Sequence, residues 1–276
     1  MNELWVGFDE AGLGPILGPL SLSIFTTSKT FDFPILDSKK VHKKGNLKPL
    51  KKRCNLYCPN LKFLNLDDSI ADLNTIGCTK EPWLMNESSI NDEFNTLFHH
   101  QEDDINLYSR LISVGDYNKV LSSGLNKADT VLHFMLPMIQ KVIEESPNFD
   151  RVNLMFDRLG GRKKYRPILE KWGLNIASSH ENPDISRYYG NLNGQPWDIG
   201  FRVKGDLYHH STAAASLFAK LRRELAMERM NKWWSKRIPG LKSTAGYWTD
   251  GLRFLNDIDL YRSNHNISDN FLRRNK

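Results

Sequence analysis

Two adjacent carboxylates, Asp9 and Glu10, stand between an apolar segment and a turn rich in glycine and proline. The sequence there reads GFDEAGLGPILGP over residues 7–19. Successive side chains of a strand point to opposite faces, so we expect the strand to stop at this pair, with Gly12 and Gly14 in the turn that follows. Main-chain N–H groups bared in such a turn can approach a phosphate closely. Acidic side chains beside free amides indicate a place for metal ions and phosphate.

Two further carboxylates end short apolar segments. Asp157 closes VNLMFD and is followed by the turn RLGGR, and Asp206 closes WDIGFRVKGD ahead of a helix that we expect to begin near Ser211. If these two acids gathered with Asp9 and Glu10, they would raise one another's pKa unless cations lay among them. Two Mg2+ or Mn2+ ions held by such carboxylates are a common device for the attack of water on a phosphodiester.

Several other chemistries are not supported. Gly12, Gly14 and Gly18 have the spacing G-x-G-x-x-x-G, which differs from the dinucleotide-binding fingerprint, and the chain contains no P-loop and no G-x-S-x-G nucleophile elbow. The three cysteines lack the C-x2-C spacing of a zinc ribbon or finger, and we interpret them as free thiols.

The elements that must position the carboxylates can be read from apolar periodicity. Residues 3–9 and 20–26 have strand patterns on either side of the turn, which predicts an antiparallel hairpin. Residues 128–145 have helical spacing despite Pro137, where we expect a kink. This helix leads into the strand that ends at Asp157, which is a site-building unit of α/β folds.

The helix near Ser211 begins with small residues, which would let it approach whatever lies beneath. Its later part carries an apolar stripe formed by Leu217, Leu221, Leu225 and Met230. We expect its basic residues to stay outside the core: Lys220, Arg222, Arg223 and Arg229.

Composition is that of an ordinary globular protein. The 276 residues are 40% hydrophobic and 25% charged, enough to bury a full core. The sequence contains no apolar run of the roughly 18 residues that a membrane span needs, and the N-terminus lacks the pattern of a signal peptide. We therefore expect a cytoplasmic, monomeric protein without a membrane partner.

Charge is unevenly distributed along the chain. Residues 60–106 contain ten acidic residues against two basic ones, a net charge of −8, which leaves +14 on the remainder of a chain whose total is +6. Basic residues cluster in residues 39–53 and 158–166. A basic body of this kind indicates a polyanionic partner, and the clustering favours nucleic acid.

Five motifs in one order resemble type 2 ribonuclease H (ribonuclease HII). They are GFDEAGLGPILGP, LDSKK at 36–40, the strand that ends at Asp157, KGDLYHHSTAAASLFAKLRRE at 204–224, and TAGY at 244–247. The resemblance covers residues 1–53, about 126–172, and 200–255. It implies an α/β fold, with a ribonuclease H-like mixed sheet flanked by helices and a helical C-terminal part.

The resemblance also implies a function and a site. The expected substrate is an RNA:DNA hybrid or a ribonucleotide-containing duplex, cut to 3′-hydroxyl and 5′-phosphate ends with two Mg2+ or Mn2+ ions. The implied catalytic and metal-binding residues are Asp9, Glu10, Asp157 and Asp206. The implied substrate-binding residues are Gly12, Leu13, Gly14, Lys39 and Tyr247.

Leu13 departs from the family pattern, which has an arginine between two glycines in the turn that reads the 2′-hydroxyl. Main-chain groups of the turn can still contact that hydroxyl, but the phosphate contact of an arginine is lost. Asp157 and Asp206 also lie 49 positions apart, farther than in ordinary members of the family.

We therefore predict one catalytic domain at 1–255, followed by a C-terminal tail at 256–276. We expect insertions at about 60–124, which is acidic, and at about 178–198, which has the pattern of a polar hairpin. Two alternatives stay open: a nucleic-acid binding protein of this fold that does not cleave, and a nuclease that acts on structured DNA.

Overall fold

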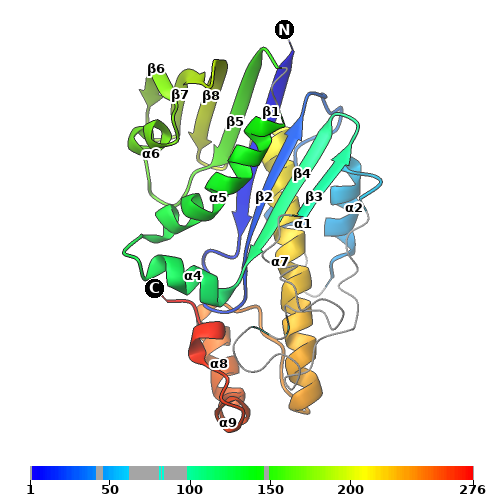
Figure 1. Ribbon diagram of the computed structural model, residues 1–276. Helices are drawn as coiled ribbons and strands as arrows, with labels where there is room; N and C mark the ends of the chain where they lie inside the picture. Colours follow the sequence, from blue (N-terminus) through cyan, green and yellow to red (C-terminus); the bar gives the residue numbers. More distant parts are fainter. Residues whose placement is uncertain are drawn as a thin grey trace.

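The computed structural model describes residues 2–41, 46–61, 81, 83, 98–145 and 149–275. Within them, an eight-stranded mixed sheet has helices on both faces (Figure 1). The strands are β1 Glu3–Ala11, β2 Leu20–Thr27, β3 Phe98–Glu102, β4 Ile105–Ile112, β5 Arg151–Asp157, β6 Asn175–Glu181, β7 Ile185–Leu192 and β8 Gln195–Arg202. The helices are α1 Ser38–Val41, α2 Lys48–Tyr57, α4 Val114–Leu121, α5 Lys127–Glu144, α6 Arg166–Lys171, α7 His210–Arg237, α8 Trp248–Asp257 and α9 Asp259–Asn264. Short 3-10 helices span η2 Gly205–Leu207 and η3 Asp269–Phe271.

The strand order is β3-β4-β2-β1-β5-β8-β7-β6. β1 and β2 form the antiparallel hairpin that the sequence predicts. β5 pairs in parallel with both β1 and β8, while the outer pairs are antiparallel. The mixed α/β fold expected from the sequence is confirmed, and the ends of β1 and β5 lie next to each other at the centre of the sheet.

Helices bury the two faces of the sheet in separate clusters. α5 crosses one face and α7 follows the other, extending beyond the sheet to the region of α8 and α9 (Figure 1). Leu22 and Ile24 of β2 pack in the α5 cluster, whereas Phe25 of the same strand packs against the first turns of α7. A third cluster, which includes Trp233 and Trp234, lies between the far half of α7 and the C-terminal helices. Every residue of β2 is therefore buried.

The sequence predicts that the basic residues of α7 lie outside the core, but not all of them do. Arg223 and Arg229 are buried, and the guanidinium of Arg222 donates a hydrogen bond to the carbonyl of Ser109 in β4. Burial lowers the pKa of Arg222 to about 10. The expectation was wrong because α7 packs against the sheet on one side and against the C-terminal segment on another.

Part of the expected acidic insertion belongs to the sheet. Residues 98–121 form β3, β4 and α4, and β4 pairs along its whole length with β2. These residues are therefore regular structure, although polar residues around the alternation in Ile105–Ile112 obscured its strand pattern, and whether they are an insertion stays a prediction. Most of the remaining acidic residues, at 62–80 and 84–97, lie outside the described residues.

The second expected insertion is a hairpin that widens the sheet. β7 and β8 are joined at Asn193 and Gly194, which both have positive φ, as a tight hairpin turn requires. β6 then pairs with the outer edge of β7. These strands lie on the Asp157 side of the sheet, and Arg202 of β8 is in register with Asp157, while the insertion itself stays a prediction.

The C-terminal residues return to the start of the chain. Arg273 forms an isolated antiparallel bridge with Leu17, and the N–H of Arg274 donates to the carbonyl of Ile16 at 2.9 Å. Ile267 and Leu272 are buried in the cluster around Trp233. Within the described part of the chain, we find no helix whose length and hydropathy suit a bilayer crossing.

Candidate functional site

Asp9 lies near the end of β1, on the face that α7 covers. It is 7% exposed, and its side chain accepts hydrogen bonds from the hydroxyl of Ser216 in α7 and from the N–H of Glu10, the latter at 2.8 Å. Burial raises the pKa of Asp9 well above its ordinary value, and the charges of Glu10 and Asp157 raise it further. The carboxylate is therefore poorly stabilised when it is alone and ionised.

Glu10 follows on a strand that does not stop at the acidic pair. β1 continues to Ala11, which pairs with Ser21 of β2, so Asp9 and Glu10 belong to opposite faces of the sheet. This differs from the expected strand end. Burial raises the pKa of Glu10 to about 7, with a further contribution from the charge of Asp157. The charge of Asp157, at the end of the neighbouring strand, thus raises the pKa of both Asp9 and Glu10.

Asp157 is the last residue of β5, one position beyond the Phe8 and Phe156 pair that sets the parallel register with β1. Its Oδ1 accepts hydrogen bonds from the N–H of Arg158 at 2.9 Å and from the N–H of Gly205 at 3.1 Å. A Cβ on Gly205 would lie 2.5 Å from the carbonyl oxygen of Phe156, so only glycine permits this approach. The contact fixes the residue directly before Asp206 against Asp157.

α7 lies unusually close to β1. A Cβ on Gly7 would lie 2.0 Å from the carbonyl carbon of Ser211, and the hydroxyl of Thr212 donates to the carbonyl of Met155 in β5 at 3.1 Å. The small residues after Thr212 permit this approach, as the sequence analysis expected. The beginning of α7 is thus held across the two strands that carry Asp9 and Asp157.

Three polar residues that the sequence did not assign to the site form a chain of hydrogen bonds to Asp9. The hydroxyls of Ser216 and Ser38 are hydrogen-bonded at 3.1 Å, and Nζ of Lys220 donates to Ser38 Oγ at 3.0 Å. Ser38 and Lys220 thereby connect the LDSKK motif and α7 to the carboxylate that Ser216 contacts. Only the position of Ser38 within that motif could have drawn attention to it.

The carboxylates have the chemistry of a divalent-cation site. They are hard oxygen ligands, and burial together with the neighbouring carboxylates raises the pKa of Asp9 and of Glu10. The described residues include no ion pair to either side chain. They also include no group of three or more His, Cys, Asp or Glu side chains already gathered closely enough to hold a metal ion. The oxygen donors and their negative charges therefore fit Mg2+ or Mn2+, but the described side chains are not already arranged around a common centre.

The glycine turn, residues 12–18, begins directly after β1. Gly12 has a φ of 95°, and a Cβ there would lie 2.3 Å from Nε of Arg223. Leu13 is half-buried against the α5 cluster, whereas Gly14 is exposed. Glycine at position 12 thus makes room for a buried guanidinium of α7, and the exposed part of the turn is main chain.

Tyr247 is 60% exposed beside this turn. The carbonyl of the preceding Gly246 accepts hydrogen bonds from the N–H groups of Ile16 and Leu17, at 2.8 and 3.2 Å. The side chain of Tyr247 interacts electrostatically with that of buried Arg223. The TAGY segment and the glycine turn therefore meet, although more than 200 residues separate them in sequence.

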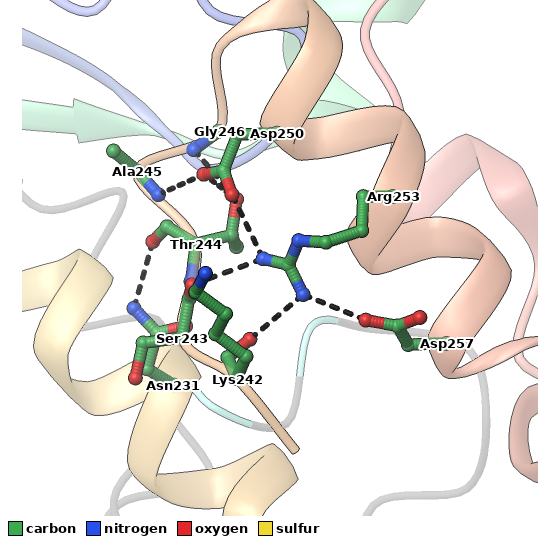
Figure 2. A network of polar contacts seen from close by, with 9 residues as sticks. All are labelled: Asn231, Lys242, Ser243, Thr244, Ala245, Gly246, Asp250, Arg253 and Asp257. Atoms are coloured by element: carbon green, nitrogen blue, oxygen red, sulfur yellow. Dashed lines mark hydrogen bonds and ion pairs between the residues drawn. The ribbon is translucent and has the colours of Figure 1, made fainter.

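A polar network holds the TAGY segment in place (Figure 2). Asp250 of α8 accepts from the hydroxyl of Thr244 at 2.7 Å and from the N–H of Ala245 at 2.8 Å. Arg253 binds Asp250 at 2.8 Å and also donates to the carbonyls of Lys242 and Ser243. Asn231 of α7 contributes further hydrogen bonds to Thr244. The network leaves the ring of Tyr247 exposed at the end of a fixed segment.

The remaining predicted substrate residue, Lys39, is in α1, next to Ser38. Its side chain lies outside the described residues. Of the predicted residues, Asp9, Glu10 and Asp157 interact with one another, Asp206 follows the residue bound to Asp157, and Gly12 and Tyr247 both lie near Arg223.

No protein-family model matches the sequence, and no curated protein does so with significance. Solved structures are similar to this chain in fold. A mutant of Bst-RNase HIII aligns with 91% of this chain at 13% identity and a TM-score of 0.51, and this chain spans 61% of that protein's length. RNase HII of the PCNA:RNase HII complex from Archaeoglobus fulgidus aligns with 99% of this chain and 97% of its own, at 14% identity and a TM-score of 0.46. Aquifex aeolicus RNase H3 aligns with 98% of this chain and 71% of its own, at 16% identity and a TM-score of 0.46. The likeness to Bst-RNase HIII shows that the chain has a ribonuclease H-like fold.

Proposed function

We propose that this chain is a divalent-metal-dependent endonuclease that hydrolyses the RNA strand of RNA:DNA hybrids to 3′-hydroxyl and 5′-phosphate ends. The observation that carries the proposal is the electrostatic coupling of Asp9, Glu10 and Asp157 at the ends of two adjacent parallel strands. A cluster of buried, mutually repelling acids is costly for a fold and unfavourable for binding a polyanion, unless cations join it. This argument favours an enzyme over a nucleic-acid binding protein that does not cleave.

In this proposal Asp9, Glu10, Asp157 and Asp206 hold two Mg2+ or Mn2+ ions. Bound ions of this kind lower the pKa of water and offset the charge of a phosphate. The protein's own groups hold the carboxylates ready: Ser216 donates to Asp9, and the N–H of Gly205 donates to Asp157. Because these donors stabilise ionised carboxylates, they favour the form that binds cations.

Substrate contacts in the proposal come from the glycine turn and Tyr247. The main chain of Gly14 is exposed beside the acidic cluster, and the Tyr247 ring offers an exposed aromatic face on a braced segment. Main-chain groups can hydrogen-bond a 2′-hydroxyl, which distinguishes a ribonucleotide from a deoxyribonucleotide. We assign Gly12, Leu13, Gly14, Lys39 and Tyr247 to this recognition surface.

A cleavage assay on three duplexes of one sequence tests the proposal. The substrates are an all-RNA strand, a strand with one ribonucleotide, and an all-DNA strand, each paired with DNA and incubated with Mg2+ or Mn2+. We expect cleavage of the ribonucleotide-containing strands only, and none in EDTA. Cleavage of the all-DNA duplex would indicate a different nuclease, and binding of all three without cleavage would indicate a binding protein.

A further inference from the structure

A small cavity of about 70 Å³ lies beside the glycine turn. Its lining includes Gly14 of the turn, Tyr117 of α4, Lys127 at the start of α5, Trp248 at the start of α8, and Arg274. None of the described residues that line it is acidic. The cavity is therefore lined by segments that are distant in sequence, and its walls carry positive charge and hydrogen-bond donors.

Arg274 supplies a buried positive charge to this cavity. Its Nε and one terminal nitrogen donate to the carbonyl of Gly18, at 2.9 and 2.7 Å, and the other terminal nitrogen donates to the carbonyl of Gly12. The residue is 4% exposed. Although burial lowers the pKa of Arg274 to about 9, the guanidinium remains protonated at neutral pH.

The charge of Arg274 has no carboxylate paired with it among the described residues. The acid that acts on it is Glu81, whose Oε1 accepts hydrogen bonds from the N–H groups of Val114 and Gly115 and whose pKa burial raises to about 8.

A second buried cation, Arg223, lies on the other side of Gly12 and lowers the pKa of Arg274 further. Arg223 donates to the carbonyl of Ala245 and pairs with Glu224 at 3.5 Å, whereas the hydrogen bonds of Arg274 go to carbonyls. An anion beside Arg274 would therefore relieve the repulsion between the two guanidiniums.

Tyr117 provides a second, independent sign of a ligand. Its side chain is 1% exposed and lines the cavity, and its hydroxyl has no hydrogen-bond partner among the described residues. Burial raises the pKa of Tyr117, so the hydroxyl keeps its proton and remains a donor. A buried hydroxyl without a partner is costly, and an oxyanion in the cavity would satisfy it. Lys127 is exposed at the same cavity and can complete the donor set.

We propose that this cavity, lined by the turn that follows Asp9 and Glu10 in the sequence, binds a phosphate group of the nucleic-acid backbone. The inference rests on the proposed function in one respect, that the phosphate belongs to a nucleic acid. The C-terminal segment then supplies, through Arg274, a positive charge at the turn in which Leu13 is apolar. Arg274 acts as a positioning residue as well, because it ties the two ends of the turn together.

The test measures binding of a short, fluorescently labelled RNA:DNA hybrid by the full chain in EDTA, over a series of salt concentrations. Lys127→Gln should weaken binding on the order of tenfold at low salt and reduce the slope of log K against log salt by about 0.9, as loss of one phosphate contact requires. Tyr117→Phe should weaken binding without changing the slope, because it removes a hydrogen bond and no charge. Lys119→Gln is the matched control, an exposed lysine of α4 outside the cavity, and should bind like the unaltered chain.

The proposal is overturned if Lys127→Gln and Tyr117→Phe bind the hybrid as tightly as Lys119→Gln does. Inorganic phosphate separates the two sources of the anion. One outcome is that inorganic phosphate raises the Tm of the unaltered chain and of Lys119→Gln, but not the Tm of Lys127→Gln or Tyr117→Phe, while all four proteins bind the hybrid equally. The cavity then binds a free anion, and the assignment to a backbone phosphate is wrong. Because cleavage is not measured, a chain that binds as expected but never cleaves would contradict the proposed function and leave this inference standing.

Discussion

At the scale of single residues, the charge beside the glycine turn comes from residues outside it. Leu13 is apolar, and the cations that contact Gly12 are Arg223 of α7 and Arg274 near the C-terminus. A phosphate held near Arg274 would be present in any duplex, so this contact adds affinity without distinguishing one ribonucleotide from many. Discrimination at the cut site is left to main-chain groups of the turn and to Tyr247.

We therefore expect a continuous RNA:DNA hybrid, which offers many equivalent cut sites, to be cleaved faster than a duplex with one ribonucleotide. Leu13→Arg should narrow or reverse this preference, since a charge-assisted hydrogen bond is worth roughly 1.5 to 3 kcal/mol. The ratio of kcat/KM for the two substrates is the measurement. Leu13→Ala controls for loss of packing, because Leu13 contacts the α5 cluster. Equal rates on both substrates, unchanged by Leu13→Arg, would contradict this reading of the turn.

The sequence singles out the acids as candidates but does not reveal the groups around them. Asp9, Glu10 and Asp157 stand beside apolar runs and glycines, which is a local pattern that one stretch of sequence can reveal. The contacts of Asp9 with Ser216 and of Gly12 with Arg274 join residues more than 200 positions apart, so no local pattern announces them. The assignment of every predicted residue to the site stays a prediction, Asp206 and Lys39 included.

At the scale of elements, the close packing of α7 on β1 decides where the acids lie. Gly7→Ala would place a methyl group 2.0 Å from the main chain of Ser211, and main chain cannot move aside as a side chain can. We expect a loss of about 3 kcal/mol or more in the free energy of unfolding, measured by urea denaturation, together with loss of cleavage. Gly161→Ala is the control, because a Cβ there meets nothing within 4 Å, and it should cost less than about 0.5 kcal/mol. Equal costs for the two variants would show that α7 does not pack as described.

The network around Asp250 predicts a pH dependence. Burial alone would raise the pKa of Asp250, but hydrogen bonds from Arg253, Thr244 and the N–H of Ala245 outweigh it and lower the pKa to about 2. Between the ordinary value of 3.8 and about 2, the unfolded chain binds more protons, so this stabilisation is present above pH 4 and is lost as the pH falls toward 2.

Asp250→Asn should therefore be less stable than the unaltered chain at pH 6, and the difference should shrink as the pH falls through this window. Urea denaturation at a series of pH values provides the measurement. Asp259→Asn, which removes an exposed partner of Arg262, should change stability little at any pH. A constant difference for Asp250→Asn across the window would show that its carboxylate is not stabilised as described.

Elements with strong apolar periodicity were predictable. The β1 and β2 hairpin, α5, β5 and the start of α7 all lie where the pattern places them. β4 was missed because polar residues surround it, and the burial of Arg223 was missed because periodicity along one helix does not reveal that it is enclosed on two sides. The continuation of β1 past Asp9 was missed because glycine and proline after the acids indicated an earlier stop.

At the scale of the whole molecule, the acidic residues are concentrated in one part of the chain. We expect this part to lie apart from the surface that binds the substrate. Six of these acidic residues lie outside the described residues: Asp67, Asp68, Asp72, Glu87, Asp92 and Glu93. We predict that they lie away from the substrate-binding face, because negative charge beside that face would oppose phosphate. Replacing all six with the corresponding amides should leave kcat/KM on the hybrid nearly unchanged. A strong gain in affinity at low salt would instead show that this region competes with nucleic acid.

The fold class followed from the sequence, whereas the strand order did not. Parallel pairing of β1, β5 and β8 depends on long connections whose path no local pattern specifies. The C-terminal residues, predicted as a tail, bury Ile267 and Leu272 and reach the glycine turn. The C-terminal segment thus packs against the glycine turn near the N-terminus, which places Arg274 beside the candidate site.

Cleavage of an RNA:DNA hybrid by the unaltered chain and by Asp9→Asn, in the same Mg2+ or Mn2+ buffer, tests the central claim most directly. The amide keeps the shape of the carboxylate while removing charge from the cation site, so the fold should persist and Tm should not fall. We predict cleavage to 3′-hydroxyl and 5′-phosphate ends by the unaltered chain, and at least a roughly thousandfold loss in the variant, of the order that removal of a main electrostatic contribution to catalysis costs. Equal cleavage by the two proteins, or none by the unaltered chain with either ion, would contradict the account.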